Sequence, residues 1–424
     1  MKRFIWMMTV FTLLCMSGMS QEKQVQAGSL GVRGVWVSCF EFEKFGLKDK
    51  PEGVFRANAD RIFANIKANG CNTVYFHVRA YDDAIYPSSV VGWSRYISGS
   101  GSALSYNPLS ILVSSAHKHG LKFHAWMNPY RVTAKKVLDP GQNSTTDRIV
   151  RQVKEMIEHY PVDGIHFDDY FYPTNEKKYK KVDKATRMKN VNGMVQSVYH
   201  AVKQKNKRLL FGISPAGDIN YCERIGADVK TWLSCRGYID YIVPQIYWSD
   251  HYLLAGKKTK LFTTRLSAWR KINSIDIPMY VGLALYKTGY KLTEDPGWQK
   301  SSRNIARQIT EISTGNTEGY VLFSYSDLYR ASASKELKHY FESIGKIYMS
   351  KSRKTLKAGK KYRLRASISI GRLAGKLKWR SSNKKIATVT KTGLVKARKK
   401  GKVKIYASYG SLKRYGLIKV KKKK

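Results

Sequence analysis

Short apolar segments alternate with longer amphipathic segments from residue 31 to about residue 345. The apolar segments have the length and composition of buried parallel strands, and the amphipathic segments have the 3.6-residue period of helices. Strands are predicted at Gly34–Ser38, Thr73–Val78, Lys122–Met127, Gly164–Asp168, Leu209–Ile213, Tyr241–Gln245, Met279–Leu283 and Tyr320–Phe323. Helices are predicted after them at Phe55–Asn69, Pro108–His119, Asp147–His159, Arg187–Lys205, Asp228–Ser234, Lys260–Asn273, Arg303–Thr314 and Lys335–Ile344.

This repeated strand–helix order predicts an α/β fold, a (β/α)8 barrel of the TIM type. A doubly wound open sheet is the structural alternative. It is less favoured because no GxGxxG loop follows the first strand.

The pattern changes at about residue 350, where the helical period ends and short β-type runs separated by Gly and Asn turns begin. A segment of this length and pattern is typical of a small all-β, Ig-like sandwich with one thin core. Its predicted core residues are Trp379, Ile386, Val389, Val395, Val403 and Ile405.

The first residues have the pattern of a secretory signal. Lys2 and Arg3 precede an apolar stretch from Phe4 to Met16, which is too short for a confident membrane span. Small residues follow, and the cleavage site is open between Ser20 and Ala27. The expected organisation is therefore a signal and short mature segment over 1–27, a barrel over 28–346 and a basic β domain over 347–424, in an exported protein that is extracellular or cell-wall associated.

The net charge of +47 is concentrated at the carboxyl end. Residues 350–424 contain 28 Lys and Arg and no Asp or Glu, which leaves 47 − 28 = 19 positive charges for the rest of the chain. For an exported protein, the anionic partners to expect are cell-wall polymers, membrane headgroups or acidic polysaccharide, and nucleic acid is not expected. The alternative is that lysine-rich surfaces are general in this protein and bind nothing in particular.

Four cysteines remain after the signal segment: Cys39, Cys71, Cys222 and Cys235. They form no CxxC pair and have no His at metal-ligand spacing, so they indicate no zinc site. Cys39 and Cys71 adjoin predicted strands and are expected in the core. A Cys222–Cys235 disulfide is compatible with export but not required by the sequence.

The run from Asp163 to Pro173, DGIHFDDYFYP, is the strongest chemical signal. An apolar strand ends in two adjacent carboxylates, followed by aromatic residues. Because side chains alternate along a strand, His166 and Asp168 are expected to face the barrel interior if Ile165 and Phe167 face the helices. Asp168 is predicted to be catalytic. Asp169 either shares this work or only caps a turn.

The other predicted strands also place polar and aromatic residues near their carboxyl ends, where a barrel core would normally contain Val, Ile and Leu. A ligand with many hydroxyl groups would satisfy such polar groups, and aromatic faces suit the apolar faces of sugar rings. The predicted substrate-binding residues are Trp36, His77, Arg79, His124, Trp126, Asn128, Arg131, His166, Tyr170, Gln245, Tyr247 and Trp248.

Other reaction classes are less well supported. No GxSxG segment indicates a serine nucleophile. A metal site from His77, His124, His166 and Asp168, as in a metal-dependent carbohydrate deacetylase, is the alternative, but the first strand lacks the HxH pair of amidohydrolases. We therefore expect no metal and no cofactor.

Seven segments resemble the glycosyl hydrolase-like 10 family from about Val32 to Ile344. They are RGVWV from Arg33, NTVYFHVR from Asn72, DDAIYPS from Asp82, HAWMNPYR from His124, the run from Asp163, ISP from Ile213 and PQIYW from Pro244. The resemblance implies a (β/α)8 barrel and glycoside hydrolysis at the cell envelope. Bacterial relatives are similar to hydrolases that cut peptidoglycan glycan strands already stripped of stem peptides.

The run from Asp163 also resembles, in part, the DGxDxDxE motif of chitinase-like barrels. Asp163 and Asp168 match two of its acids, but His166 replaces an Asp and Tyr170 replaces the Glu that donates the proton. The proton donor must then come from elsewhere, and the candidates are Asp169, Asp82 and Asp218.

The tail resembles the bacterial Ig-like group 2 domain through KWRSSN from Lys378, IATV from Ile386 and GLVKA from Gly393. Together these features predict an exported glycoside hydrolase that acts on a cell-envelope glycan, with the basic domain binding an anionic wall polymer. Asp168 would act as nucleophile or as stabiliser of an oxocarbenium-like transition state. The rival functions are a non-catalytic glycan-binding protein and the metal-dependent deacetylase.

Overall fold

The computed structural model describes residues 31–173, 177–300, 303–313, 319–344, 347–368, 377–409 and 412–422. The predicted signal over 1–27 lies outside the described residues. Parallel strands form one eight-stranded sheet in the order β11-β12-β1-β2-β5-β6-β7-β8. Their bounds are β1 Val32–Val37, β2 Thr73–Arg79, β5 Lys122–Met127, β6 Gly164–Phe167, β7 Leu210–Ile213, β8 Tyr241–Ile242, β11 Tyr280–Leu283 and β12 Gly319–Leu322.

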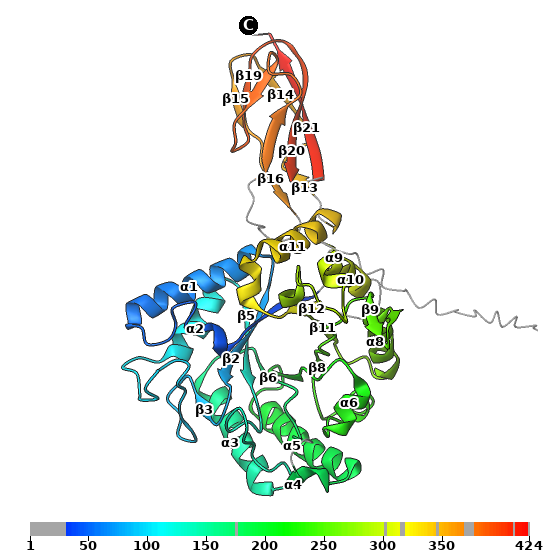
Figure 1. The fold of residues 1–424 in the computed structure, drawn as a ribbon. Coiled ribbons are helices and arrows are strands. Elements are labelled where there is room, and N and C mark those ends of the chain that lie inside the picture. The colour runs from blue at the N-terminus through cyan, green and yellow to red at the C-terminus, as the bar shows by residue number, and fades with distance from the viewer. Residues whose placement is uncertain are drawn as a thin grey trace, which may run out of the picture.

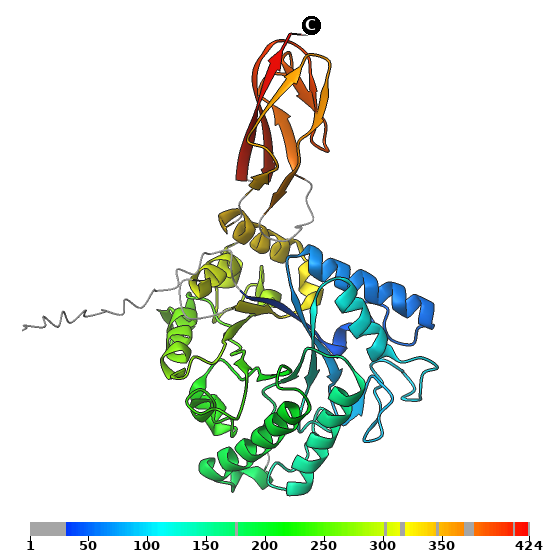
Figure 2. The ribbon, with the colours of Figure 1, turned by 180° about the vertical axis from the view of Figure 1, so that it is seen from behind.

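The sheet closes on itself because parallel bridges join Ile242 to Met279 and Gln245 to Gly282. Closure confirms the predicted (β/α)8 barrel, and the doubly wound alternative is wrong. The helices surround the closed sheet (Figures 1 and 2). The helices that follow successive strands are α1 Glu52–Ala68, α2 Pro108–Lys118, α3 Asn143–His159, α5 Lys184–Lys205, α6 Ile219–Arg224 with α7 Val229–Trp232, α8 Leu261–Ile272, α10 Asn304–Ser313 and α11 Ala331–Ile344.

The predicted elements differ from the observed ones mainly at their ends. The predicted strand to Gln245 is regular only to Ile242, because Pro244 has no N–H for the ladder. Helix α3 begins at Asn143, four residues before the predicted start, in a Ser/Thr-rich turn that resembles a loop in sequence. Short elements not predicted lie in the loops: β3 Asp83–Ala84, β4 Gly92–Trp93, β9 Tyr252–Leu254, β10 Lys257–Thr259, α4 Lys177–Lys180, α9 Gly297–Lys300 and the 3-10 helices η1 Cys39–Glu41, η2 Leu285–Lys287 and η3 Tyr325–Tyr329.

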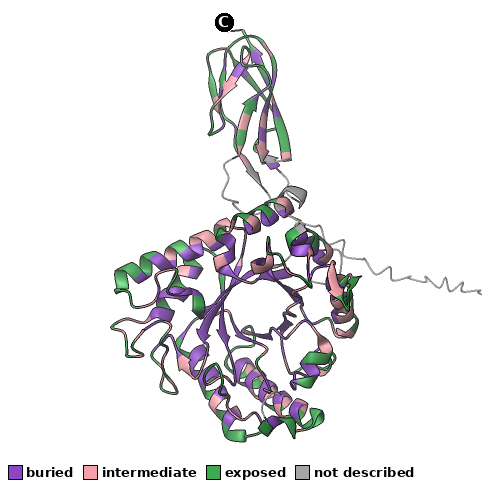
Figure 3. Ribbon diagram, viewed as in Figure 1, coloured by how far each residue is buried: buried purple, intermediate pink, exposed green. Residues whose placement is uncertain are grey.

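The barrel strands are buried on both faces (Figure 3). Aliphatic and Phe side chains point out to the helices, whereas the interior is aromatic, with Trp36, Tyr75, Trp126, Tyr241 and Tyr280 in one cluster. Glycines on neighbouring strands make room for these rings. A Cβ on Gly212 would lie 2.3 Å from the Tyr241 ring, and one on Gly34 would lie 2.7 Å from the Tyr75 ring.

The four cysteines of the described residues, Cys39, Cys71, Cys222 and Cys235, are free thiols. Cys39 and Cys71 are buried, as predicted, and Cys222 donates from its Sγ to the carbonyl of Ala216 at 3.1 Å. The disulfide between Cys222 and Cys235 that export would permit is therefore not formed. Among the described helices, none has both the length and the apolar character needed to cross a bilayer.

The carboxyl-terminal unit is an all-β sandwich that extends beyond α11 (Figure 1). A four-stranded sheet, β14-β21-β20-β17, packs on a three-stranded sheet, β15-β19-β18, and β13 pairs with β16. Of the predicted core residues, Val395, Val403 and Ile405 are buried, and Trp379, Ile386 and Val389 are partly buried against them. The strand bounds are β13 Ile347–Met349, β14 Arg353–Lys357, β15 Lys361–Arg363, β16 Ala366–Ile368, β17 Lys378–Ser381, β18 Ala387–Val389, β19 Leu394–Ala397, β20 Gly401–Tyr409 and β21 Leu412–Lys421.

Candidate active site

A cavity of about 480 Å³ opens at the carboxyl ends of the barrel strands. Every barrel strand or the loop after it contributes to the lining, which is why residues far apart in the sequence meet there. The lining consists of Trp36, Ser38, Phe40, His77, Ala80, Tyr81, Trp126, Asn128, Arg131, Asp168, Asp169, Tyr170, Ser214, Gln245, Tyr247, Tyr286 and Phe323.

Asp168 and Asp169 are the carboxyl groups among these lining residues. Asp168 follows β6 directly and is 8% exposed. Its Oδ1 accepts hydrogen bonds from Gln245 Nε2 at 3.0 Å and from the backbone N–H of Asp169 at 2.8 Å. Gln245 is itself fixed, because the same Nε2 donates to the carbonyl of Ser214 at 2.9 Å. Asp168 therefore faces the cavity, as the alternation of side chains along the strand predicts.

The two carboxyl groups interact and are electrostatically different. Burial raises the pKa of Asp168, but its hydrogen bonds from Asp169 and Gln245 act in the opposite direction. Burial raises the pKa of Asp169 well above its ordinary value, and the charge of Asp168 raises it further. Asp168 is thus the better candidate for the ionised partner and Asp169 for the protonated one.

A cation and an aromatic ring flank the pair at the rim. The guanidinium of Arg131 lies 3.8 Å from the centre of the Tyr170 ring and donates to the carbonyl of Ala134 at 2.7 Å. Its charge lowers the pKa of both aspartates, though less than burial raises them. Tyr170 is 42% exposed and presents an edge that a ligand can reach.

On β2 and β5, the two strands before β6 in the barrel sheet, His77 and Trp126 form a flat, buried stack. Their ring centres are 3.8 Å apart with an angle of 6° between the planes. Trp126 Nε1 donates to Asn128 Oδ1 at 3.1 Å, and Asn128 Nδ2 donates to the carbonyl of Ala80 at 3.0 Å. Burial lowers the pKa of His77 to about 3, so the imidazole is neutral at ordinary pH.

Beneath the cavity, polar rings form a hydrogen-bonded layer inside the barrel. Trp36 Nε1 donates to His166 Nε2 at 3.1 Å, so neutral His166 carries its proton on Nδ1, which lies 3.1 Å from the Tyr241 hydroxyl. That hydroxyl also lies 2.9 Å from Nδ1 of His124. Burial lowers the pKa of His124 to about 4 and that of His166 well below its ordinary value. His124 and His166 thus face the interior as predicted, but they support the site from below and do not line it.

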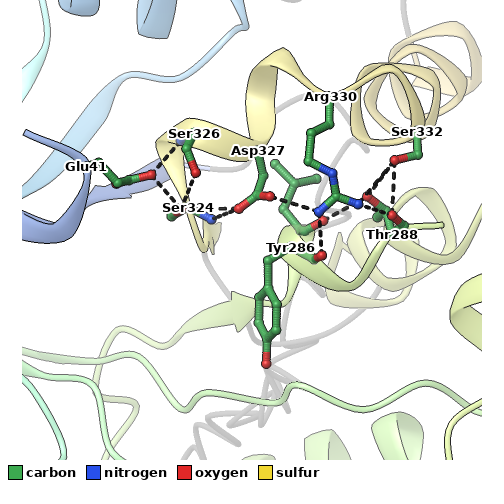
Figure 4. Close-up of polar contacts among 9 residues, drawn as sticks. Glu41, Tyr286, Thr288, Ser324, Ser326, Asp327, Arg330 and Ser332 are labelled. Carbon is green, nitrogen blue, oxygen red and sulfur yellow. Dashed lines mark hydrogen bonds and ion pairs between the residues drawn. The ribbon is translucent and has the colours of Figure 1, made fainter. Parts of the chain in front are cut away.

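A polar network holds the wall formed by the loops after β1, β11 and β12 (Figure 4). Glu41 accepts from Ser324 Oγ at 2.8 Å and from the Ser326 N–H at 2.6 Å. Arg330 donates to Asp327 at 2.9 Å and to the carbonyl of Tyr286 at 2.6 Å. The Tyr286 ring points away from this network (Figure 4) and lines the cavity. The network therefore fixes the backbone that presents Tyr286.

Asp82 and Arg79 are not part of the lining. Asp82 is paired with Arg79 at 3.2 Å and with Arg148 at 2.8 Å, and these cations lower its pKa. Arg79 is 1% exposed and also donates to the carbonyls of Asn128 and Pro129. The prediction of Asp82 as proton donor and of Arg79 as substrate contact is contrary to this geometry, because Asp82 is held by Arg79 and Arg148, and Arg79 is held by Asp82 and the loop backbone.

Asp218 and Trp248 are also placed outside the lining. Asp218 caps α6 by accepting from the Tyr221 N–H at 3.0 Å and forms an ion pair with Arg265. The Trp248 ring lies against Gly217 and 5.9 Å from the Arg265 guanidinium. Asp163 lies at the start of β6, where it pairs with Lys122 and His117. Of Asp163 and Asp168, the two acids that match the chitinase-like motif, only Asp168 therefore lies at the cavity.

Several lining residues were not predicted as site residues: Ser38, Phe40, Ala80, Tyr81, Ser214 and Phe323. Phe323 and Ser214 follow from the same alternation, since each stands at an inward position at the end of its strand. Phe40 and Tyr81 come from loops, and no periodic signal places a loop side chain. Phe40 is 68% exposed, which leaves its ring accessible to a ligand.

Within the described part of the chain, no group of three or more His, Cys, Asp or Glu side chains is arranged to hold a metal ion. The residues of the metal-site alternative are held apart by other contacts. His77 stacks on Trp126, while His124 and His166 bind the Tyr241 hydroxyl.

A (β/α)8 barrel whose mouth presents a carboxyl pair among aromatic rings suits glycoside hydrolysis. The model of the Glycosyl hydrolase-like 10 family matches residues 31–137 and 131–300, and the chain belongs to this family. The model of the Bacterial Ig-like domain (group 2) matches residues 345–412. Both predicted resemblances are confirmed, and the protein is a glycoside hydrolase.

The names of similar proteins agree with this class. The chain is 30% identical over 362 residues to Glycosyl hydrolase YngK of Bacillus subtilis, covering 70% of this chain and 68% of the relative. It is 27% identical over 392 residues to Glycosyl hydrolase DigH of Escherichia coli K12, covering 72% and 86%. The fold is similar to that of the glycoside hydrolase domain of PgaB (BpsB) from Bordetella bronchiseptica, with a TM-score of 0.51, 11% identity and coverage of 72% and 98%.

Proposed function

We propose that this protein is an exported glycosidase that cleaves an N-acetylated glycan of the cell envelope, namely the glycan strands of peptidoglycan, by acid catalysis with help from the substrate's own acetamido group. The single observation that carries the proposal is the adjacency of Asp168 and Asp169 on one wall of the cavity.

The adjacency of the acids argues for the chemistry. Enzymes that use two separate carboxylates place them on opposite sides of the bond, about 5–5.5 Å apart when retaining and about 6.5–9.5 Å apart when inverting. Here both carboxyl groups come from consecutive residues, and no other carboxyl group belongs to the described lining. Strands β12 and β1, which lie across the barrel from β6, contribute Phe323, Trp36 and Ser38 to the lining, and none of these is a carboxylate.

A sugar with a 2-acetamido group supplies the missing nucleophile, as in substrate-assisted glycosidases. Its carbonyl oxygen attacks C1 while Asp169 gives its proton to the departing glycosidic oxygen. Ionised Asp168 stabilises the positive charge that develops on the ring and the acetamido nitrogen. Water then adds to C1, Asp169 takes the proton of that water, and the acetamido group is restored with net retention at C1.

The lining suits such a substrate. Tyr170, Tyr247, Tyr286 and Phe323 provide rings for the apolar faces of sugars, and Asn128, Ser38 and Ser214 provide groups for hydroxyl hydrogen bonds. Tyr247 is an unsuitable alternative nucleophile because burial raises the pKa of its hydroxyl well above the ordinary value. The basic carboxyl-terminal domain would keep the enzyme on an anionic envelope polymer.

The test uses purified residues 28–424 with glycan strands stripped of stem peptides, and mass spectrometry of the soluble products. The parent protein should release fragments, and Asp168→Asn and Asp169→Asn should each lower the rate by at least about 100-fold. Strands that have been chemically de-N-acetylated should resist cleavage. Efficient cleavage of the de-N-acetylated strands would refute the assisting role of the acetamido group, and no cleavage of either substrate would refute the choice of substrate.

A further inference from the structure

The outer face of the sheet β14-β21-β20-β17 carries an array of exposed cations. Because paired residues of neighbouring strands point to the same face, the strand register identifies its members. Arg380 pairs with Tyr406, which pairs with Tyr415, and Lys402 pairs with Lys419. This cationic face consists of Arg353, Lys357, Lys378, Arg380, Lys402, Lys404, Lys413, Lys419 and Lys421, all exposed.

The opposite face of the same sheet forms the core of the domain, with Leu356, Val403, Ile405, Ile418 and Val420 buried. The outer face is thus not needed for packing. The strands of the other sheet, β15-β19-β18, carry only three cations: Lys361, Arg363 and Lys396. The face thus holds nine of the 28 Lys and Arg of residues 350–424, the strands of the other sheet hold three, and the other 16 lie elsewhere in this segment, so the two sheets of the sandwich differ in charge.

Two tyrosines organise the cations at the centre of this face. Arg380 and Lys413 lie 5.3 Å and 4.5 Å from the Tyr406 ring centre, and Lys404 lies 4.7 Å from that of Tyr415. The two rings are 5.7 Å apart. Residues 350–424 contain no Asp or Glu, and no salt bridge of the described residues involves this face. Cation–π contacts thus order the cations without neutralising them.

We propose that this cationic face binds a linear, phosphodiester-linked polymer of the cell wall. This role adds a binding partner to the proposed function and rests on its premise that the protein is exported. Side chains two apart on one strand lie about 6.6 Å from each other, and neighbouring strands are about 4.8 Å apart. A chain with repeated phosphates can therefore contact several ammonium groups at once. Lysine, which forms most of the face, suits such contacts as a point charge.

Other polyanions fit this face less well. Single-stranded nucleic acid is bound by successive stacking on aromatic rings, and this face has two such rings, Tyr406 and Tyr415, each with a cation over it. Insertion into a membrane needs apolar side chains, and the only aliphatic one in the middle of the face is Leu417, which is partly buried.

The experiment measures binding of catalytically inactive Asp168→Asn protein to walls of a Gram-positive bacterium by sedimentation, before and after extraction of phosphodiester polymers with hydrofluoric acid. The variant Arg380→Ala/Lys404→Ala/Lys413→Ala should bind about 100-fold more weakly. Each cation near an anionic surface strengthens binding about fivefold, and the variant removes three of them. The matched control Lys384→Ala/Lys385→Ala/Lys399→Ala removes the same charge from exposed turns outside the face and should lose less than about tenfold. Thermal unfolding of both variants should match that of the parent.

Tyr406→Leu tests the organising role without changing the charge and should weaken binding about 2- to 5-fold. Equal losses in the face and control variants, unchanged binding after extraction, or tighter binding to duplex DNA or phosphatidylglycerol vesicles at the same ionic strength would each overturn the proposal. Because binding is measured without hydrolysis, the result stands whether or not the glycosidase proposal survives its own test.

Discussion

The hydrogen bond from Gln245 to Asp168 gives the sharpest test of the carboxyl pair. Gln245→Met keeps the length of the side chain but removes the N–H that donates to Asp168 Oδ1 at 3.0 Å. Asp168 keeps its bond from the backbone N–H of Asp169. Since a carboxylate loses one stabilising bond, the pKa of Asp168, already raised by burial, should rise further.

The magnitude follows from the strength of the bond. A hydrogen bond to a charged group contributes about 1.5–3 kcal/mol, and 1.36 kcal/mol corresponds to one pKa unit, so the pKa should rise by about 1–2 units. Catalysis in our proposal needs ionised Asp168, and the rate falls as the pH drops through its pKa. The acidic limb of the pH profile of kcat/KM should therefore move to higher pH by about 1–2 units. The apparent pKa values of that profile belong to the coupled pair of Asp168 and Asp169.

The assay is the pH dependence of kcat/KM on soluble, peptide-free glycan fragments. Ser214→Ala is the control, because Gln245 binds the backbone carbonyl of Ser214 and the Ser214 hydroxyl donates to Phe167. Its acidic limb should not move. An unchanged limb in Gln245→Met, or a shift to lower pH in a protein with normal thermal unfolding, would refute the assignment of Asp168 as the ionised partner.

Three further outcomes are expected. Asp169→Asn should raise the free energy of unfolding at pH 7 by about 1–3 kcal/mol in urea titrations, because an acid whose pKa is raised on folding destabilises the protein above its unfolded pKa. This gain in stability should vanish near pH 3. A loss of stability at pH 7 would contradict the assignment of a raised pKa to Asp169. Gly212→Ala should lower the free energy of unfolding by about 1–3 kcal/mol in the same assay, since its Cβ would lie 2.3 Å from the Tyr241 ring. The control is Gly193→Ala in α5, where the added Cβ has no atom within 4 Å, and it should leave the stability unchanged or raise it. Arg330→Met should raise KM about 3- to 10-fold with little change in kcat, because it frees the backbone that presents Tyr286; a large fall in kcat alone would argue against a positioning role.

The periodic parts of the molecule were predictable from sequence. The alternation of strand residues placed Asp168 and Gln245 at the mouth and His166 inside the barrel, and all three lie there. What alternation cannot give is depth along the barrel axis. Depth depends on the stagger between strands, so His124 and His166 were predicted to bind substrate although they form the layer below.

The loop residues were less predictable, because their role depends on partners brought close only by folding. Asp82 and Asp218 looked like candidate acids, yet Arg148 lies 66 residues after Asp82 and Arg265 lies 47 residues after Asp218. An ion pair formed over such separations has no signature in the sequence. For the same reason, the approach of Phe40 and Tyr81 to the cavity could not be foreseen.

The neutral imidazoles of His77 in the lining and of His166 in the layer beneath it have a consequence for the carboxyl pair. A protonated His77 or His166 would be a buried cation near the carboxyl pair, and it would lower the pKa of Asp169 and remove its proton. Burial prevents this, since it lowers the pKa of His77 to about 3 and that of His166 well below its ordinary value. Polar rings can therefore fill the barrel interior, satisfy one another by hydrogen bonds and still leave a protonated carboxyl group available above them.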